Sequence, residues 1–162
     1  MEDAKACQTQ REELPLSKAA EHLLEECRMV LPGIQMLFGF QLIVVFNPGF
    51  DQKLTPAEQH VHLLAIVLVT IAAAVIMSPA AYHRQKPREV TDEFITVFRR
   101  LLFWSMVPLS LGITLDFYLV ARVILGSVLG SLLAGAVFAA IATLWFIFPR
   151  AQVLRRNVGG RT

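Results

Sequence analysis

Cysteine is scarce in this sequence, and the short motifs that mark enzymes and metal sites are absent. The two cysteines of the 162-residue chain, Cys7 and Cys27, both precede the first long apolar run. They should therefore share one compartment, which favours reduced thiols over a disulfide framework. The chain has no phosphate-binding glycine loop, no HExxH, CxxC or GxSxG motif, and no TVGYG-type filter. These absences disfavour an enzyme, and the sequence predicts no cofactor and no metal site.

Charge is also limited. The formal net charge of +2 is too small to indicate a nucleic-acid partner. No apolar run contains the repeated arginines of a voltage sensor. No apolar run has an acidic residue at the position expected for the middle of the membrane, and this absence disfavours a proton-coupled pump. Residues 1–28 lack the apolar core of a cleavable signal peptide. Membrane insertion should therefore begin with the first span itself.

Apolar residues make up 55% of the chain and are gathered into long runs. A helix needs about 20 mostly apolar residues to cross a bilayer. We therefore predict an all-α membrane bundle in contact with lipid, and a chain that turns once between Asp116 and Gly126. The four predicted spans are at about residues 29–46, 61–82, 99–117 and 123–148. Residues 1–15 are predicted as a disordered tail, 16–150 as the membrane domain and 151–162 as a basic tail.

Basic residues predict the orientation of the bundle. Thirteen of the fifteen Lys and Arg residues lie in residues 1–28, 83–100 and 149–162, three flanks that share one side if there are four spans. Lys and Arg are retained on the cytoplasmic side. Both termini are therefore predicted to be cytoplasmic.

Two local patterns predict helices outside the apolar runs. Thr55 to Glu58 resembles a capping box with proline at the first helical position, so the second helix should start there. Residues 16–28 have apolar side chains at helical spacing opposite charged ones, which predicts an amphipathic helix. That helix fits either the inner leaflet of the membrane or a packing face of its own bundle.

The fourth apolar run contains small residues at helical spacing. Gly126, Gly130 and Ala134 recur at four-residue steps, with Ser127, Ser131 and Gly135 beside them. Small residues let two helix backbones approach closely in lipid. Two interpretations stay open, namely packing within the chain and self-association into a homo-oligomer.

Isolated polar residues occur at a similar depth in the inner half of the spans. Ser78, Ser105 and Thr143 define this predicted polar layer, together with Gln35 of the first span. Such side chains either satisfy backbone carbonyls near the prolines or line an aqueous pocket.

The main candidate site lies at the inner edge. Arg28 and Gln35 share one helical face, Glu25 lies close to Arg28, and His83 follows the second span at the same level. A histidine beside a carboxylate can act as a sensor or gate. The alternative is an anchor belt of interfacial Tyr, His and Arg side chains.

The residues expected at the outer edge of the bundle give no candidate metal site and one candidate ion pair. Glu58, His60 and His62 are close in sequence, but His60 points away from the face shared by the other two, so they do not converge on a metal. Asp116 and Arg122 are predicted to pair across the turn after the third span.

Three segments together resemble a known group of proteins. They are residues 26–38 (ECRMVLPGIQMLF), residues 80–84 (AAYHR) and residues 114–116 (TLD). With these segments the chain resembles a family of small, uncharacterised bacterial membrane proteins with four predicted spans. The resemblance implies a bacterial plasma (inner) membrane and brings no assigned activity, ligand or catalytic residue.

Two functions follow as hypotheses. The first is an oligomeric channel or permeation path gated at its cytoplasmic side by the Arg28, Gln35 and His83 cluster. The second is a non-transporting scaffold or accessory subunit that docks a protein partner at its cytoplasmic face. A membrane enzyme is a weaker third hypothesis, because the chain shows no recognisable nucleophile or metal set.

Overall fold

The computed structural model describes the backbone of residues 2–85 and 92–148, and all regular structure within these ranges is helical. The elements are α1 (Glu2–Val45), α2 (Phe50–Lys53), α3 (Pro56–Gln85), α4 (Asp92–Leu125), α5 (Ser127–Ala142) and the π-helical turn η1 (Thr143–Ile147). Within the described residues, four helical stretches are long and apolar enough to cross a membrane: Glu21–Val45, Pro56–Tyr82, Ile95–Leu125 and Ser127–Ile147. The prediction of an all-helical chain with four spans is confirmed at this level.

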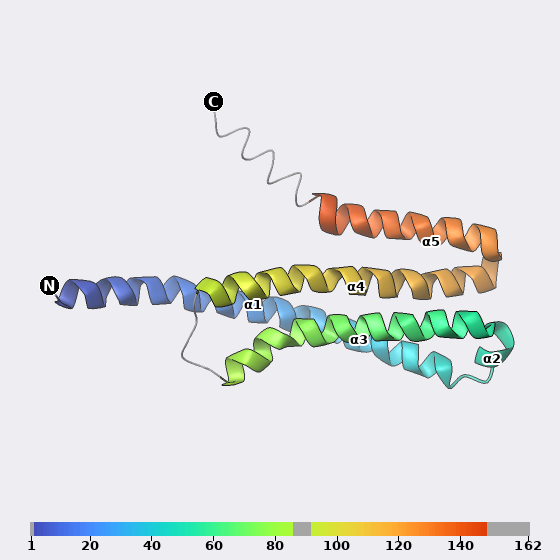
Figure 1. The fold of residues 1–162 in the computed structure, drawn as a ribbon, viewed down its shortest axis with the longest axis horizontal. Helices are drawn as coiled ribbons and strands as arrows, with labels where there is room; N and C mark the ends of the chain where they lie inside the picture. The colour runs from blue at the N-terminus through green and yellow to red at the C-terminus, as the bar shows by residue number, and fades with distance from the viewer. Residues whose placement is uncertain (1, 86–91, 149–162) are drawn as a thin grey trace, which may run out of the picture.

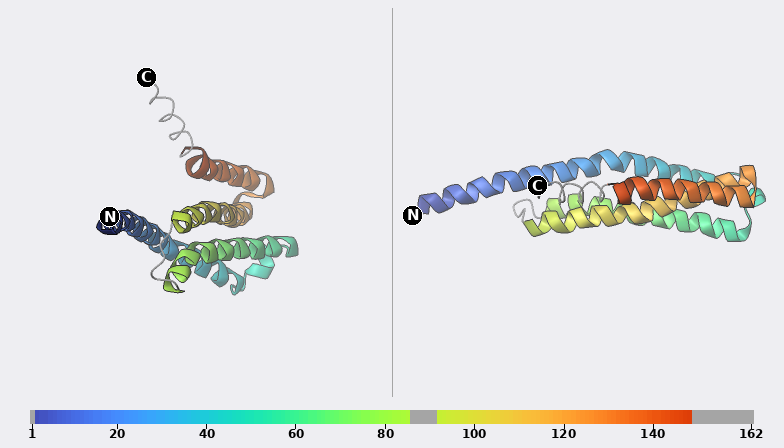
Figure 2. Two further views of the ribbon diagram at one scale, coloured as in Figure 1. Left: turned by 60° about the vertical axis from the view of Figure 1, so that its left-hand side comes forward. Right: turned by 90° about the horizontal axis from the view of Figure 1, so that it is seen from above.

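Helix α1 starts well before the membrane domain. Residues 2–15, predicted as a disordered tail, form the first turns of this helix. The segment is rich in Ala, Glu, Lys, Gln and Arg, all of which favour helix. This part of α1 projects beyond the ends of the other helices (Figures 1 and 2). The predicted basic tail at 151–162 lies outside the described residues.

The third span is longer than its sequence pattern indicated. Helix α4 continues past the predicted end at residue 117 as far as Leu125, and only Gly126 separates it from α5. Gly126 has a φ of 85°, in the left-handed region that glycine adopts without steric cost. The chain therefore reverses at the last residue of the interval in which the turn was expected.

Helices α1, α3 and α4 share one hydrophobic core. The cluster of buried residues joins Cys27 and Ile34 of α1, Val69, Ala72 and Ile76 of α3, and Leu109 of α4. Three residues along α3, namely Ala65, Val69 and Ala72, are 0% exposed. A Cβ at Gly112 of α4 would lie 2.8 Å from Val69 Cγ2, so a glycine is needed where α4 crosses this face. The centre of the three-helix core is therefore apolar and closely packed.

Helix α5 lies at the edge of the bundle. It runs beside α4, which separates it from α3 (Figures 1 and 2). Its only buried residues are Gly130 and Ala134. The connection at residues 46–55 and the one-residue turn at Gly126 lie at one end of the bundle, which we call the α2 end (Figure 1).

Candidate functional site

Three helices meet through polar side chains near the α2 end. His62 of α3 places Nδ1 3.0 Å from Asp116 Oδ1 of α4, and Nε2 3.0 Å from the Gln41 backbone carbonyl of α1. The Gln41 side-chain amide donates to Asp116 Oδ2 at 2.5 Å. Gln41 and His62 are buried, and the Asp116 side chain is 18% exposed. We call these three residues the polar triad.

Each member of the polar triad lies inside an apolar span. Asp116, predicted to sit in the turn after the third span, is ten residues before Gly126, which is about 15 Å along a helix. Polar groups are costly in such surroundings unless they are paired. Each of the three therefore finds its partners on the other two helices, and the triad fixes how α1, α3 and α4 are aligned.

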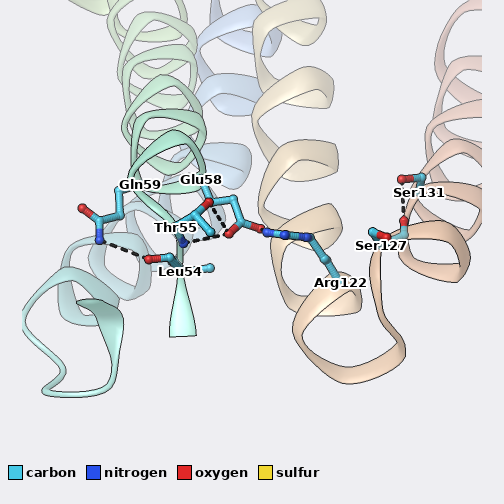
Figure 3. A network of polar contacts seen from close by, with 7 residues as sticks. All are labelled: Leu54, Thr55, Glu58, Gln59, Arg122, Ser127 and Ser131. Atoms are coloured by element: carbon cyan, nitrogen blue, oxygen red, sulfur yellow. Dashed lines mark hydrogen bonds and ion pairs between the residues drawn. The ribbon is translucent and has the colours of Figure 1, made fainter. Parts of the chain in front are cut away.

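A second polar cluster lies nearer the end of the helices. Glu58 of α3 forms an ion pair with Arg122 of α4, and its Oε2 accepts hydrogen bonds from Thr55 N at 2.8 Å and Thr55 Oγ1 at 2.7 Å (Figure 3). The predicted helix start at Thr55 and Pro56 is confirmed. This cluster closes the first turn of α3 and ties it to the last turn of α4.

The predicted pair between Asp116 and Arg122 is wrong. Both residues lie on the continuous helix α4, where a separation of six residues puts them on different faces. Asp116 instead faces His62, and Arg122 faces Glu58. The exposed His60 contacts the Pro56 carbonyl of its own helix through Nδ1 at 2.6 Å. Within the described ranges, no group of three or more His, Cys, Asp or Glu side chains could hold a metal ion.

A pocket of about 470 Å³ adjoins the polar triad. Its walls come from α1, from α2 with the residues around it, and from α4, and they are mostly apolar. The apolar lining includes Leu37, Phe40, Val44, Phe50, Leu119, Val120, Val123 and Ile124. Gln41, His62 and Asp116 form its main polar part, and Lys53 and Asn47 also line it.

One acceptor beside this pocket is unsatisfied. Gln41 Oε1 is buried, yet it accepts no hydrogen bond from any residue that the structure describes. The amide cannot turn over to remedy this, because its nitrogen already donates to the Asp116 carboxyl group. A buried acceptor without a donor is costly, so a hydrogen-bond donor brought to this atom would be stabilising.

The predicted inner cluster is not brought together in this way. Glu25, Arg28 and Gln35 are all exposed on α1, whose buried face is formed by Leu23, Cys27 and Ile34. The side chain of His83 lies outside the described residues. The structure therefore places the three described members on the outer surface of a single protomer.

The predicted polar layer consists of side chains that bond to their own helices. Ser78 donates to the Ala74 carbonyl at 2.9 Å, Ser105 to the Leu102 carbonyl at 2.6 Å and Thr143 to the Ala139 carbonyl at 2.7 Å. None of these bonds goes to a carbonyl freed by a proline four residues later. The three side chains thus have their hydrogen-bond acceptors on their own helices, and none of them lines the pocket of about 470 Å³ described above.

The predicted small-residue face divides into two stripes. Gly126 is the exposed turn residue, whereas Gly130 and Ala134 are buried on the side of α5 that faces α4, and a Cβ at Gly130 would lie 2.8 Å from Arg122 Cα. Ser127, Ser131 and Gly135 are exposed, and Ser131 donates to the Ser127 carbonyl at 2.7 Å (Figure 3). The first stripe packs within the chain.

The four spans and the polar triad define a multi-pass helical membrane protein with a polar centre embedded near one end. More particularly, the chain belongs to a family of proteins of unknown function, DUF6328, which matches residues 9–149. The expected resemblance to a family without an assigned activity agrees with this match. No curated protein and no solved structure matches the chain.

The polar triad is not apparent from the sequence when the spans are aligned at their basic flanks alone. Counted from the α2 end, Gln41 comes shortly before the end of α1 and His62 shortly after the start of α3. Aligning the spans at both boundaries would have brought these two residues to one level. Asp116 required the correct position of the turn as well.

Proposed function

We propose that this protein binds an uncharged, largely apolar small molecule in the pocket at the α2 end. The single observation behind the proposal is an apolar pocket of about 470 Å³ beside a buried acceptor, Gln41 Oε1, that has no donor. Ligand pockets in proteins typically measure about 300–1,000 Å³ and combine apolar walls with a few convergent polar groups. The pocket has both properties.

The chemistry of the pocket narrows the ligand to a class. An acceptor without a partner requires a donor, so the ligand should have a hydroxyl or similar group directed at Gln41 Oε1. A charged ligand would lose its hydration among the apolar walls. An anion would also face the Asp116 carboxyl group, which lines the pocket. A neutral, hydroxyl-bearing apolar molecule fits these conditions best.

The setting of the pocket follows from the charge distribution. The resemblance to small bacterial membrane proteins supports a bacterial plasma membrane, and the basic flanks support both termini in the cytoplasm. The α2 end would then be the outer end, because it lies across the bundle from these flanks. A ligand of this class would reach the pocket from the outer half of the bilayer or from the outer surface.

A matched pair of ligands tests the proposal. The purified full chain in lipid nanodiscs is titrated with 1-dodecanol and with methyl undecyl ether, which has the same number of heavy atoms but no donor. One uncharged hydrogen bond of about 1 kcal/mol corresponds to about fivefold tighter binding of the alcohol. Equal affinities for the alcohol and the ether, or no binding of either, would overturn the proposal.

Two glutamine variants make the test specific. Gln41→Leu removes the free acceptor and should abolish the preference for the alcohol. Gln35→Leu is the control, because Gln35 lies on the same helix but is exposed. A preference that persists in Gln41→Leu would assign the alcohol to another place on the protein.

A permeation path between protomers is a second candidate, favoured by the outward-facing polar residues of α1. Gln35 is exposed within a span, where contact with lipid is unfavourable. A path through one protomer would meet the closely packed residues of α3, so water would pass between copies, with gating at Arg28 and Gln35. Proteoliposome flux that Gln35→Leu reduces would support this candidate, and absence of flux for all ions tested would eliminate it.

A further inference from the structure

We infer that the pair formed by His62 and Asp116 carries one more proton than a neutral histidine beside an ionised carboxylate would carry. The inference rests on which atoms the two ring nitrogens face. Nδ1 lies 3.0 Å from a carboxyl oxygen of Asp116, and Nε2 lies 3.0 Å from the Gln41 backbone carbonyl oxygen. A carbonyl oxygen only accepts hydrogen bonds, and so does an ionised carboxylate.

A neutral imidazole cannot satisfy both contacts. It has one N–H group and one nitrogen lone pair. If Nε2 donates to the Gln41 carbonyl, the Nδ1 lone pair faces an oxygen lone pair of Asp116. If Nδ1 donates to Asp116, the Nε2 lone pair faces the carbonyl oxygen. Either arrangement leaves a repulsive contact at 3.0 Å inside a buried site.

One additional proton removes the conflict in either of two ways. His62 can carry both ring protons beside an ionised Asp116, or a protonated Asp116 can donate to Nδ1 while Nε2–H donates to the carbonyl. Both states contain the same number of protons, so the additional proton is shared by the pair and is not assigned to either residue alone. The bound proton belongs to the contact between α3 and α4, whichever atom holds it.

The other charged groups near the pair are already engaged or lie further out. From α1, the uncharged Gln41 amide donates to Asp116 Oδ2. Glu58 of α3 and Arg122 of α4 pair with each other. Near α2, Lys53 is exposed where it lines the pocket, and the Phe50 ring lies 5.7 Å from the His62 ring. Within the described residues, no Lys or Arg forms an ion pair with Asp116.

Loss of the proton would loosen α1. His62 holds α1 through the Gln41 carbonyl, and Asp116 holds it through the Gln41 amide. Repulsion between His62 Nδ1 and Asp116 Oδ1 would move these two residues apart and weaken their hydrogen bonds to Gln41. The folded chain binds more protons than the unfolded chain at pH values where a free histidine is neutral, so stability should fall as the pH rises. This inference does not depend on the proposed ligand.

Nuclear magnetic resonance of the full chain in lipid nanodiscs tests the proton directly. Histidine ring nitrogens labelled with ¹⁵N and aspartate carboxyl groups labelled with ¹³C are followed from about pH 5 to about pH 9, the range that spans the titration of an ordinary histidine. The chain has four histidines, so the other three provide references in the same sample. His62→Gln and His60→Gln assign the signals.

The expected result is that His62 keeps both ring protons, or Asp116 stays protonated, at a pH where the exposed His60 ring is neutral. The contrary result is a neutral His62 ring beside an ionised Asp116 at that pH, which would overturn the inference. Asp116→Asn supplies a second measurement, because an amide can donate to Nδ1 without an added proton. The fall in thermal stability with rising pH should therefore be smaller in Asp116→Asn than in the wild type, whereas an equal fall would count against a shared proton.

Discussion

The contact between α4 and α5 gives a sharp prediction about a single methyl group. In Gly130→Ala, the added Cβ would lie 2.8 Å from Arg122 Cα and N and 3.1 Å from Ala121 C. All three are backbone atoms, which cannot rotate away. Ordinary contact begins at 3.4 Å, so the helices must separate by roughly 0.6 Å at this point.

The size of the effect follows from two opposing contributions. Overpacking of this kind costs about 1–3 kcal/mol, and the exchange of glycine for alanine in a helix returns about 0.5–1 kcal/mol. With mid-range values of about 2 and about 0.75 kcal/mol, we expect Gly130→Ala to lower the free energy of unfolding by about 1 kcal/mol. Gly135→Ala on the same helix is the matched control, because a Cβ there would meet nothing within 4 Å. It should be neutral or slightly stabilising.

Tryptophan fluorescence during unfolding in mixed detergent micelles measures the difference. Trp145 follows α5 and packs against the core cluster, so its emission reports separation of α5 from the rest of the bundle. Gly130→Ala should unfold at a lower mole fraction of denaturing detergent than Gly135→Ala. Identical midpoints for the two variants would refute the close approach of α4 and α5 at Gly130.

Three further substitutions probe other contacts with the same assay. Gly112→Ala should cost about 1–3 kcal/mol, because its Cβ would lie 2.8 Å from Val69 Cγ2. Adding Val69→Ala should then cost less than the sum of the two single changes, and strict additivity would contradict the contact. Glu58→Gln should cost about 1–3 kcal/mol through loss of the ion pair with Arg122. Asp51→Asn, an exposed change nearby, is its control. Gly126→Ala should cost about 1–2 kcal/mol, because a φ of 85° strains any residue with a Cβ; an unchanged midpoint would argue against that turn.

The spans were predictable from the sequence because each depends on a local property. A long apolar run predicts a transmembrane helix without reference to the rest of the chain. The start of α3 was predictable for the same reason, since Thr55 and Glu58 lie three residues apart and bond to each other. The end of α4 was harder to predict, because the apolar pattern continues almost unbroken into α5 and only the φ of Gly126 marks the turn.

The candidate site was not predictable in the same way. Gln41, His62 and Asp116 are separated by 21 and 54 residues in sequence, and their contacts depend on how three helices are aligned. A shift of one helix by one residue would turn its polar side chain by about 100° away from the others. The predicted inner cluster assumed that a face with Arg28 and Gln35 is turned inward, whereas Leu23, Cys27 and Ile34 occupy the inward face of α1.

The position of α5 outside the three-helix core has a consequence for how the molecule responds to its bilayer. Helices α1, α3 and α4 share a core, whereas α5 packs along one face on α4, where Gly130 and Ala134 are buried, and Trp145 just after α5 reaches the core cluster. A change in lipid thickness is met by tilting helices, at a cost of fractions of a kcal/mol per ångström of mismatch. Because Gly126 is the turn between α4 and α5, we expect the last span to change its tilt there while the polar triad, which lies on the other three helices, keeps its geometry. Thinner or thicker membranes should therefore alter the outline of the protein and leave its buried polar centre undisturbed.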